Sequence, residues 1–489
     1  MKNIRQLTSK EVIFVGGETP NIYQHTGGLI ILDPSDAPGW GFDTFRKHTA
    51  SQIGGIPQFR WRLHEVPLGL DLPYWVEDED FNIDRHVRKI AVPSPGDEAA
   101  LAELVGYLYS KHMDRNHALW ETWFIEGLKD GHCAVFHKVH HCLMDGQGAA
   151  KLMEYMFENS PDAAPQSLPA ELADAQVGEI PEPWRQAITA AWRLYSLPVK
   201  AGLEINDIFV KKLWKKLKKK PGQAKASKPV VTNAPFNTNV GAERGFVYGS
   251  LPIADIKAVK NHFGVTVNDL VLALVSGSLR DYLLQHLELP DIPLRTFIAV
   301  SLRQEGDKEF SNKVTTAAVT LATDLEDPVK RLRAIAADSG AAKKGARGGG
   351  KGSMEIQQML PPVLNTALAY AYPPDKIASL AGANLLVSNV RASSSKMFLA
   401  GARVESIYPM SIVGPGLGIN VTCIGYAREI GVGITLAPEL FPECWKIIEG
   451  MKTQLRSYRT LTRKSSGPRS TASKRNKRPA RKAAPAKRR

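Results

Sequence analysis

The chain has few cysteines and no long apolar segment. Its 489 residues include four cysteines, which form neither a CxxC pair nor a regular spacing, so neither a disulfide framework nor a zinc knuckle is indicated. No run approaches the roughly 18 apolar residues that a membrane-spanning helix needs, and the first residues lack the apolar core of a signal peptide. We therefore expect a cytoplasmic protein that is not integral to a membrane.

Acidic residues are missing from two segments. Residues 461–489 contain twelve Lys/Arg and no acid, and residues 211–228 contain nine lysines and no acid. Without these 21 cations the rest of the chain carries 42 basic and 49 acidic residues, so the net charge of +14 comes from two basic segments on a mildly acidic body. The terminal segment also lacks aromatic residues, which predicts a disordered arm. Such an arm either binds polyanions through counterion release or only adds solubility.

The rest of the sequence is typical of a globular mixed α/β protein. It is 43% apolar and 23% charged, and it is long enough for two or more domains with their own cores. An amphipathic pattern predicts a helix over residues 266–287, with Thr266 or Asn268 as its N-cap. The alternation of strands with such helices favours open sheets covered by helices. Runs rich in β-branched and aromatic residues predict strands at 27–33, 132–141, 295–302, 383–390, 418–427 and 429–436.

Shifts in composition predict the domain organisation. A stretch rich in Pro, Ala and acids at 160–183 reads as a linker, and a stretch rich in Gly and Lys at 341–353 predicts a mobile loop. We expect an N-terminal domain at 1–183, a helical connector at 184–228, a C-terminal domain at 229–460 and a basic tail at 461–489.

The connector contains a basic amphipathic pattern, "INDIFVKKLWKKLKKK" at residues 205–220. Apolar residues recur at helical spacing while lysines fill the other face. This pattern indicates a helix that lies in a membrane interface, or alternatively a surface helix whose lysines are only solvated. The apolar residues proposed to dock are Phe209, Leu213, Trp214 and Leu217.

The most informative stretch is "VFHKVHHCLMDGQGAAKLMEYMFEN" at residues 135–159. A strand with a period of two places His137 and His141 on one face and His140 on the other. Asp145 then stands at the N-cap of a following helix, and Gly146 permits a tight entry into it. An imidazole beside a tight turn is well placed as a general base near neutral pH, because its pKa lies there. One of His140 and His141 can thus face a cleft while its neighbour packs beneath it, and His137 is expected to pack or line the site.

Three other interpretations of this stretch are weaker. A metal site formed by His137, His141 and Asp145 needs a helix where the sequence predicts a strand, and no second ligand cluster completes it, so no metal is expected. A serine hydrolase needs a G-x-S-x-G elbow, which the chain lacks. A purely structural role for the aspartate and the histidines is weakened by three histidines beside one turn.

These residues carry a family resemblance. "HHCLMDG" at residues 140–146 matches the HHxxxDG motif of the CoA-dependent acyltransferase and condensation-domain superfamily. The wider pattern resembles the bacterial wax ester synthase/acyl-CoA:diacylglycerol acyltransferase family, with departures at Ala118-Leu119-Trp120, where that family usually has Pro-Leu-Trp, and at Arg391-Ala392-Ser393, where it has Pro-Gly-Pro. The matching segments are "LTSKEVIFVGGETPNIYQHTGGLIILD", "FRWRL", "ALWETWFIEGL", "TVNDLVLALVSGSLRDYL", "VSLR", "LLVSNV" and "GPGLGINVTCIGYAREIGVGI".

The resemblance implies a fold and an activity. The fold would be two domains like chloramphenicol acetyltransferase with open mixed sheets, and a tunnel between them would admit acyl-CoA from one side and an alcohol from the other. The reaction would transfer a long-chain acyl group from acyl-CoA to a fatty alcohol or to diacylglycerol, with His141 as general base and no covalent acyl-enzyme. Acyl-CoA would be a substrate, and no cofactor is expected.

The resemblance also implies roles for individual residues. His140 would support His141, Gly146 would give the backbone room, and Asp145 would pair with Arg60 or Arg62 to fix the turn. The polar groups that would support the reacting centre are Asn268, Asp269, Ser388 and Asn389.

Apolar products fit an enzyme that is peripheral on the inner membrane or on lipid inclusions, with no specific nucleic-acid partner. The alternatives are a related acyltransferase with another alcohol or amine acceptor, and a non-catalytic lipid-binding protein.

Overall fold

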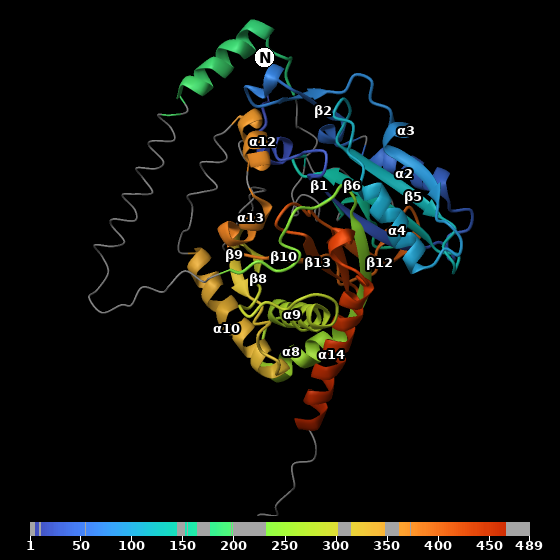
Figure 1. Cartoon of the computed structure of the whole chain (residues 1–489). Coiled ribbons are helices and arrows are strands. Elements are labelled where there is room, and N and C mark those ends of the chain that lie inside the picture. The colour runs from blue at the N-terminus through green and yellow to red at the C-terminus, as the bar shows by residue number, and fades with distance from the viewer. Residues whose placement is uncertain are drawn as a thin grey trace, which may run out of the picture.

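The computed structural model contains two large β-sheets that lie against each other (Figure 1). The residues it describes are 5–8, 11–53, 55–143, 152–153, 155–163, 177–196, 198, 231–301, 314–347, 361–371 and 373–465. Each large sheet has six strands, and a third sheet has two. The predicted mixed α/β class is confirmed.

The first sheet draws strands from both ends of the chain. Its order is β11-β12-β1-β6-β5-β4, so β1 pairs on one side with β6 and on the other with β12, which follows it by more than 350 residues. The boundaries predicted at 183 and 229 therefore do not separate the two sheets. The strands are β1 (His25–Asp33), β4 (Val87–Ala91), β5 (Trp120–Glu126), β6 (Cys133–His140), β11 (Phe398–Leu399) and β12 (Ala402–Met410).

Alternating side chains of β6 bury both faces of this sheet. Val135 packs in one core with Phe45 of helix α2 (Phe42–Ile53). Its neighbour Phe136 packs in another core with Val105 of helix α4 (Glu98–Tyr109). The period of two predicted for this segment is confirmed. The smaller elements of this half are α1 (Val12–Gly16), η1 (Pro57–Arg60), β2 (Trp61–His64), η2 (Pro67–Gly69), β3 (Tyr74–Glu77) and α3 (Ile83–His86).

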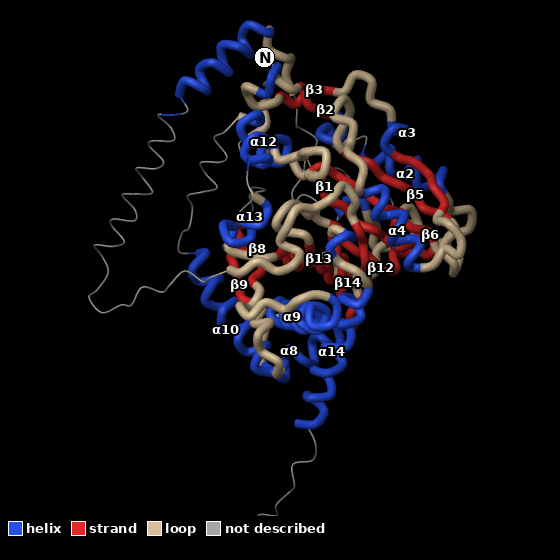
Figure 2. Tube along the Cα trace, viewed as in Figure 1, coloured by secondary structure: helices blue, strands red, loops and turns tan. Residues whose placement is uncertain are grey.

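The second sheet lies in the C-terminal half, with helices packed on one face (Figure 2). Its order is β7-β14-β13-β10-β8-β9. The strands are β7 (Gly245–Pro252), β8 (Arg295–Ser301), β9 (Val314–Thr320), β10 (Leu385–Arg391), β13 (Ile419–Tyr426) and β14 (Glu429–Leu436). The helices and the short 3-10 turn of this half are α8 (Ile253–Phe263), α9 (Val267–His286), α10 (Pro328–Arg347), α12 (Pro362–Ala371), α13 (Pro374–Ala381), η3 (Pro438–Leu440) and α14 (Trp445–Ser465).

Helix α9 begins where the sequence predicts, and its cap settles the choice between two residues. The Thr266 hydroxyl accepts a hydrogen bond from the Asp269 N–H, and the Asp269 carboxylate accepts one from the Thr266 N–H, which forms a capping box. Asn268 is the second residue of the helix and is not its cap. Among the described residues no single helix is long and apolar enough to cross a membrane, and α8 with α9 passes that test only as a pair bent by 102°.

The mobile loop predicted at 341–353 is wrong over its first half. Helix α10 continues to Arg347, so residues 341–347 are helical. The alanine, lysine and arginine residues there have high helix propensity, which outweighs one glycine. The remaining residues, 348–353, lie outside the described part of the chain.

The two sheets meet where β14 crosses β12. A Cβ atom placed on Gly433 would lie 1.9 Å from the Pro409 carbonyl oxygen, and one on Gly431 would lie 2.0 Å from the Ile407 oxygen. No side chain fits at such distances from a backbone atom. Two glycines on the same face of β14 thus allow its backbone to lie directly on β12.

We expect Gly433→Ala to lower the free energy of unfolding by about 3 kcal/mol, because the new methyl group must push β14 away from β12. Gly425→Ala on neighbouring β13 is the matched control, since a Cβ there meets no atom within 4 Å, and it should change stability by less than about 0.5 kcal/mol. Urea denaturation of both variants measures the difference. Equal effects would show that the crossing tolerates a side chain.

Candidate active site

The histidine pair lies at the end of β6, between its two neighbouring strands. The His140 N–H donates to the Leu119 carbonyl at 3.0 Å, next to β5, and the His141 N–H donates to the Gln24 carbonyl at 2.8 Å, next to β1. Both backbone positions are therefore fixed by the sheet. The two side chains differ in exposure, since His140 is buried and His141 is half-buried.

His140 is held beneath the turn by its own neighbour and by an acid. The Cys142 N–H donates to its Nδ1 at 3.2 Å, and the Cys142 Sγ lies 2.9 Å from the same atom. The other ring nitrogen, Nε2, lies 3.7 Å from the Glu18 carboxylate. The support that His140 would give to His141 stays a prediction.

Glu18 is the centre of a buried charge cluster. Arg115 donates to its carboxylate at 2.6 Å and His112 lies 3.3 Å from it, while the same Arg115 also pairs with Glu65 at 2.7 Å. Burial alone would raise the pKa of Glu18, but hydrogen bonds from His112 and His140 and the charges of His140 and Arg115 lower it well below its usual range. Glu18 therefore stays ionised beneath the histidine pair.

Sequence reasoning missed this cluster. Glu18 stands within the first matching segment of the family pattern, but its partners His112 and Arg115 follow more than 90 residues later. No periodicity relates these positions, because they converge only through the pairing of β1 and β6. The hydrogen bond to Glu18 also raises the pKa of His112.

The His141 ring is oriented by an aromatic neighbour. It stacks on Phe14 of α1 with 4.1 Å between ring centroids and 14° between ring planes. Stacking of this kind contributes about 1 kcal/mol beyond burial and limits rotation of the ring. Helix α1 is itself anchored by the buried side chains of Val12 and Val15.

His137 is a packed residue. The Thr122 hydroxyl lies 2.6 Å from its Nδ1, and its ring is near Trp120. Burial lowers the pKa of His137 to about 4, so it is neutral at physiological pH. This agrees with the expectation that His137 packs or lines the site.

Several predicted site residues lie outside the described part of the chain. They include Asp145 and Gly146 of the motif and the four apolar residues of the basic segment at 205–220, Phe209, Leu213, Trp214 and Leu217. The clamp from Asp145 to Arg60 or Arg62 thus stays a prediction. Arg60, at the end of η1, pairs with Glu77 at 2.8 Å, and Arg62 lies on β2.

The four polar groups predicted to support the reaction lie in the C-terminal half and differ in their surroundings. Asp269 is engaged in the capping box, and its Oδ1 lies 3.9 Å from the Lys343 ammonium, so its observed role is structural.

On β10 Ser388 is in phase with Val390, which packs on the core of the first sheet. Asn389 is in phase with Val387, which packs on the helices of the second sheet. Of this pair, Ser388 is the residue on the face toward the N-terminal half.

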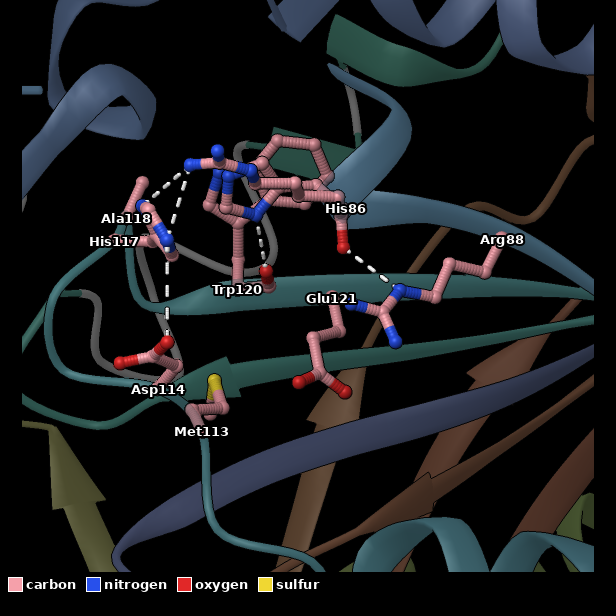
Figure 3. Close-up of a pocket in the computed structure, with 9 residues that line it drawn as sticks. His86, Arg88, Met113, Asp114, His117, Ala118, Trp120 and Glu121 are labelled. Carbon is pink, nitrogen blue, oxygen red and sulfur yellow. Dashed lines mark hydrogen bonds and ion pairs between the residues drawn. The ribbon is translucent and has the colours of Figure 1, made fainter. Parts of the chain in front are cut away.

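A cavity of about 250 Å³ opens beside the start of β5 (Figure 3). An Arg85 guanidinium nitrogen lies 3.0 Å from His117 Nε2. The same Nε2 atom lies 3.9 Å from the Asp114 carboxylate. Ala118, where the family usually has proline, is part of the wall. The residues that line this cavity are Arg85, His86, Arg88, Met113, Asp114, His117, Ala118, Trp120 and Glu121.

The tunnel predicted between the two halves stays a prediction.

We expect Glu18→Gln to lower the free energy of unfolding by about 2 kcal/mol, because it leaves Arg115 and His112 without the charge they face. It should also lower the pKa of His112, measured by NMR titration, because the hydrogen bond that raises this pKa is weakened.

The sign of the pH dependence follows from the raised pKa of His112. Its pairing stabilises the wild type fully below the ordinary pKa of 6.5, and this contribution is lost as the pH rises through the raised value. In Glu18→Gln the free energy of unfolding should fall less steeply as the pH rises through this range. Glu65→Gln, which removes the exposed partner of the same Arg115, is the control and should cost less than about 1 kcal/mol. Equal costs for the two variants would contradict a central role for Glu18.

Known proteins resemble this chain along most of its length. The model of the wax ester synthase/diacylglycerol acyltransferase catalytic domain matches residues 7–271, and that of the WS/DGAT C-terminal domain matches residues 310–459. A putative diacylglycerol O-acyltransferase of Mycobacterium tuberculosis is 32% identical over 93% of this chain and 90% of its own length. A probable diacylglycerol O-acyltransferase of the same species is 30% identical over 88% and 94%.

Solved structures agree with these matches. The wax ester synthase/diacylglycerol acyltransferase from Marinobacter aquaeolei VT8 superposes with a TM-score of 0.68 at 26% identity, over 94% of this chain and 99% of that one. A condensation domain of the calcium-dependent antibiotic synthetase, at 12% identity and a TM-score of 0.52 over 94% and 96%, shares the fold. The chain therefore belongs to the wax ester synthase/diacylglycerol acyltransferase family and is an acyltransferase.

Proposed function

We propose that the chain transfers a long-chain fatty acyl group from acyl-CoA to the hydroxyl of a fatty alcohol, of diacylglycerol, or of both, with His141 as general base. The products are a wax ester or a triacylglycerol and free CoA. Acyl-CoA is a substrate, and no cofactor takes part. The names of the Mycobacterium relatives support diacylglycerol as an acceptor, and the name of the Marinobacter enzyme supports both.

The observation that carries this proposal is the contrast between the two histidines. His140 is enclosed by Cys142 and faces Glu18, whereas the half-buried His141 ring is held against Phe14 at the strand end. The first imidazole is buried beside the turn, and the second is half-buried and oriented by stacking. These properties suit a supporting residue and a general base, respectively.

The chemistry proceeds by direct transfer. His141 takes the proton of the acceptor hydroxyl as its oxygen attacks the thioester carbonyl carbon. The tetrahedral intermediate then collapses, the bond from carbon to sulfur breaks, and the His141 imidazolium returns the proton to the CoA thiolate. No side chain is acylated, and each turnover leaves the enzyme in its starting protonation state.

The base alone does not account for an enzymatic rate. General-base catalysis supplies about 10²–10⁴-fold, so positioning and stabilisation of the oxyanion must supply the rest. Ser388, on the face of β10 toward the N-terminal half, and Asn268, in the first turn of α9, are our candidates for that support. Both substrates are lipids, which favours an enzyme that works at a membrane or lipid-inclusion surface.

We expect the purified protein to release CoA from palmitoyl-CoA only when hexadecanol or dioleoylglycerol is added, with the ester found in the lipid extract. His141→Ala should lower this rate at least about 100-fold, because it removes the base. His140→Ala should cost less, since its ring supports the turn and does not meet the substrate.

His132→Ala, before β6 on the same segment, is the control and should retain wild-type turnover. CoA release that does not differ between wild type and His141→Ala would refute the base. CoA release that depends on an added amine or another alcohol, and on neither lipid acceptor, would show that the enzyme uses a different acceptor. A wild type that binds acyl-CoA and transfers it to no acceptor would indicate a lipid-binding protein.

A further inference from the structure

The helix of residues 183–196 exposes an apolar stripe. Trp184, Ile188, Trp192 and Tyr195 are exposed by 58%, 61%, 67% and 74%. Their spacing of four, four and three residues places them on one side of the helix, and the Trp192 and Tyr195 rings are in contact, with 5.8 Å between centroids. Side chains of this size are seldom left in water together.

The opposite side of the helix is firmly attached to the protein. Gln186 and Ala190 are buried, and Arg193 forms an ion pair with Asp71, which is fully buried, and donates to Gln6 at 3.3 Å. These residues lie about half a turn from the stripe. The exposure of the aromatic side chains is therefore set by the docked orientation of the helix.

Other exposed apolar residues lie at the same end of the molecule. Leu68 in η2 is 82% exposed, and Tyr370 in α12 is 65% exposed. η2 and α12 are neighbours, since a Cβ on Gly69 would lie 3.5 Å from the Val363 Cβ. Figure 1 shows the helix of residues 183–196, in green, and α12, in orange, at the end of the molecule away from α8 and α14. We call these residues together the apolar end.

The apolar end is linked to the histidine pair through two contacts. The Thr366 hydroxyl of α12 donates to the Gly16 carbonyl of α1 at 2.6 Å. From α1, Phe14 stacks on the His141 ring. The apolar end and the His141 ring are thus connected through α12 and α1.

The charge and composition of this surface fit a phospholipid headgroup layer. Trp and Tyr are the side chains that concentrate at the boundary between water and lipid. Residues 183–196 include two arginines and no acid, and the Arg185 guanidinium lies 5.0 Å from the centroid of the Trp184 ring. Each cation near an anionic surface adds about 1 kcal/mol of attraction.

We propose that the apolar end, centred on Trp184, Ile188, Trp192 and Tyr195, docks on an anionic phospholipid surface. The docked enzyme then takes its acceptor from the membrane and returns its product to it. The docking depends only on the surface described above, whereas the delivery of an acceptor rests on the proposed function.

The first test is flotation of the full chain with vesicles of phosphatidylcholine and phosphatidylglycerol, without substrate. Trp184→Ser/Trp192→Ser should lower the partition coefficient at least about ten-fold, and Trp184→Phe/Trp192→Phe should restore most of it. Leu284→Ser is the matched control, because Leu284 is 57% exposed near the end of α9, away from the apolar end, and it should bind vesicles like the wild type.

Activity separates docking from chemistry. With a water-soluble short-chain acyl-CoA and a short alcohol, the tryptophan-to-serine variant should turn over like the wild type, which also shows that it is folded. With diacylglycerol in vesicles it should lose activity in proportion to lost binding. If the wild type acts on neither substrate pair, the proposed function fails, but the flotation result still decides the docking.

Three results would overturn the docking. The first is vesicle binding that is unchanged in the serine variant, and the second is an equal loss in Leu284→Ser. The third is a wild type that binds no vesicles and forms a dimer in solution that the serine variant disrupts. That result would make the apolar end a contact between two copies of the chain.

Discussion

The structure depends on the close crossing of two backbones. β14 lies on β12 where Gly431 and Gly433 leave no side chain between them, and β12 is hydrogen-bonded to β1, which in turn pairs with β6. The strand that ends in the histidine pair is thus connected to the second sheet through two neighbouring strands, β1 and β12. Any loosening at the glycines would shift the polar groups of the C-terminal half relative to His141.

A buried carboxylate holds separate segments of the chain together at the site itself. Glu18 faces His140, Arg115 and His112 within one cluster, so a loop before β1, the end of β6 and the segment after α4 are held by one charge. Burying that charge is costly, and its partners offset the cost. The proposed base is the next residue, His141, whose ring stacks on Phe14.

Local sequence patterns predicted the local structure, but they did not predict contacts between residues that lie far apart in the sequence. The alternation of β6 and the cap of α9 are encoded within a few residues, so the sequence was sufficient for both. The cluster around Glu18 and the pairing of β12 with β1 join residues far apart, for which no periodic signal exists. The region from Trp184 was expected to be helical, but the side that faces water is decided by the contact of Arg193 with Asp71.

The pairing of β12 with β1 has a consequence for folding during synthesis. β1 ends at Asp33 and β12 begins at Ala402, so a ribosome must make most of the chain before the first sheet can close. Until then one edge of β1 has unpaired backbone groups, which is the kind of edge that recruits foreign strands. The N-terminal half made alone would keep that open edge, and a nascent chain would need protection there until its last strands emerge.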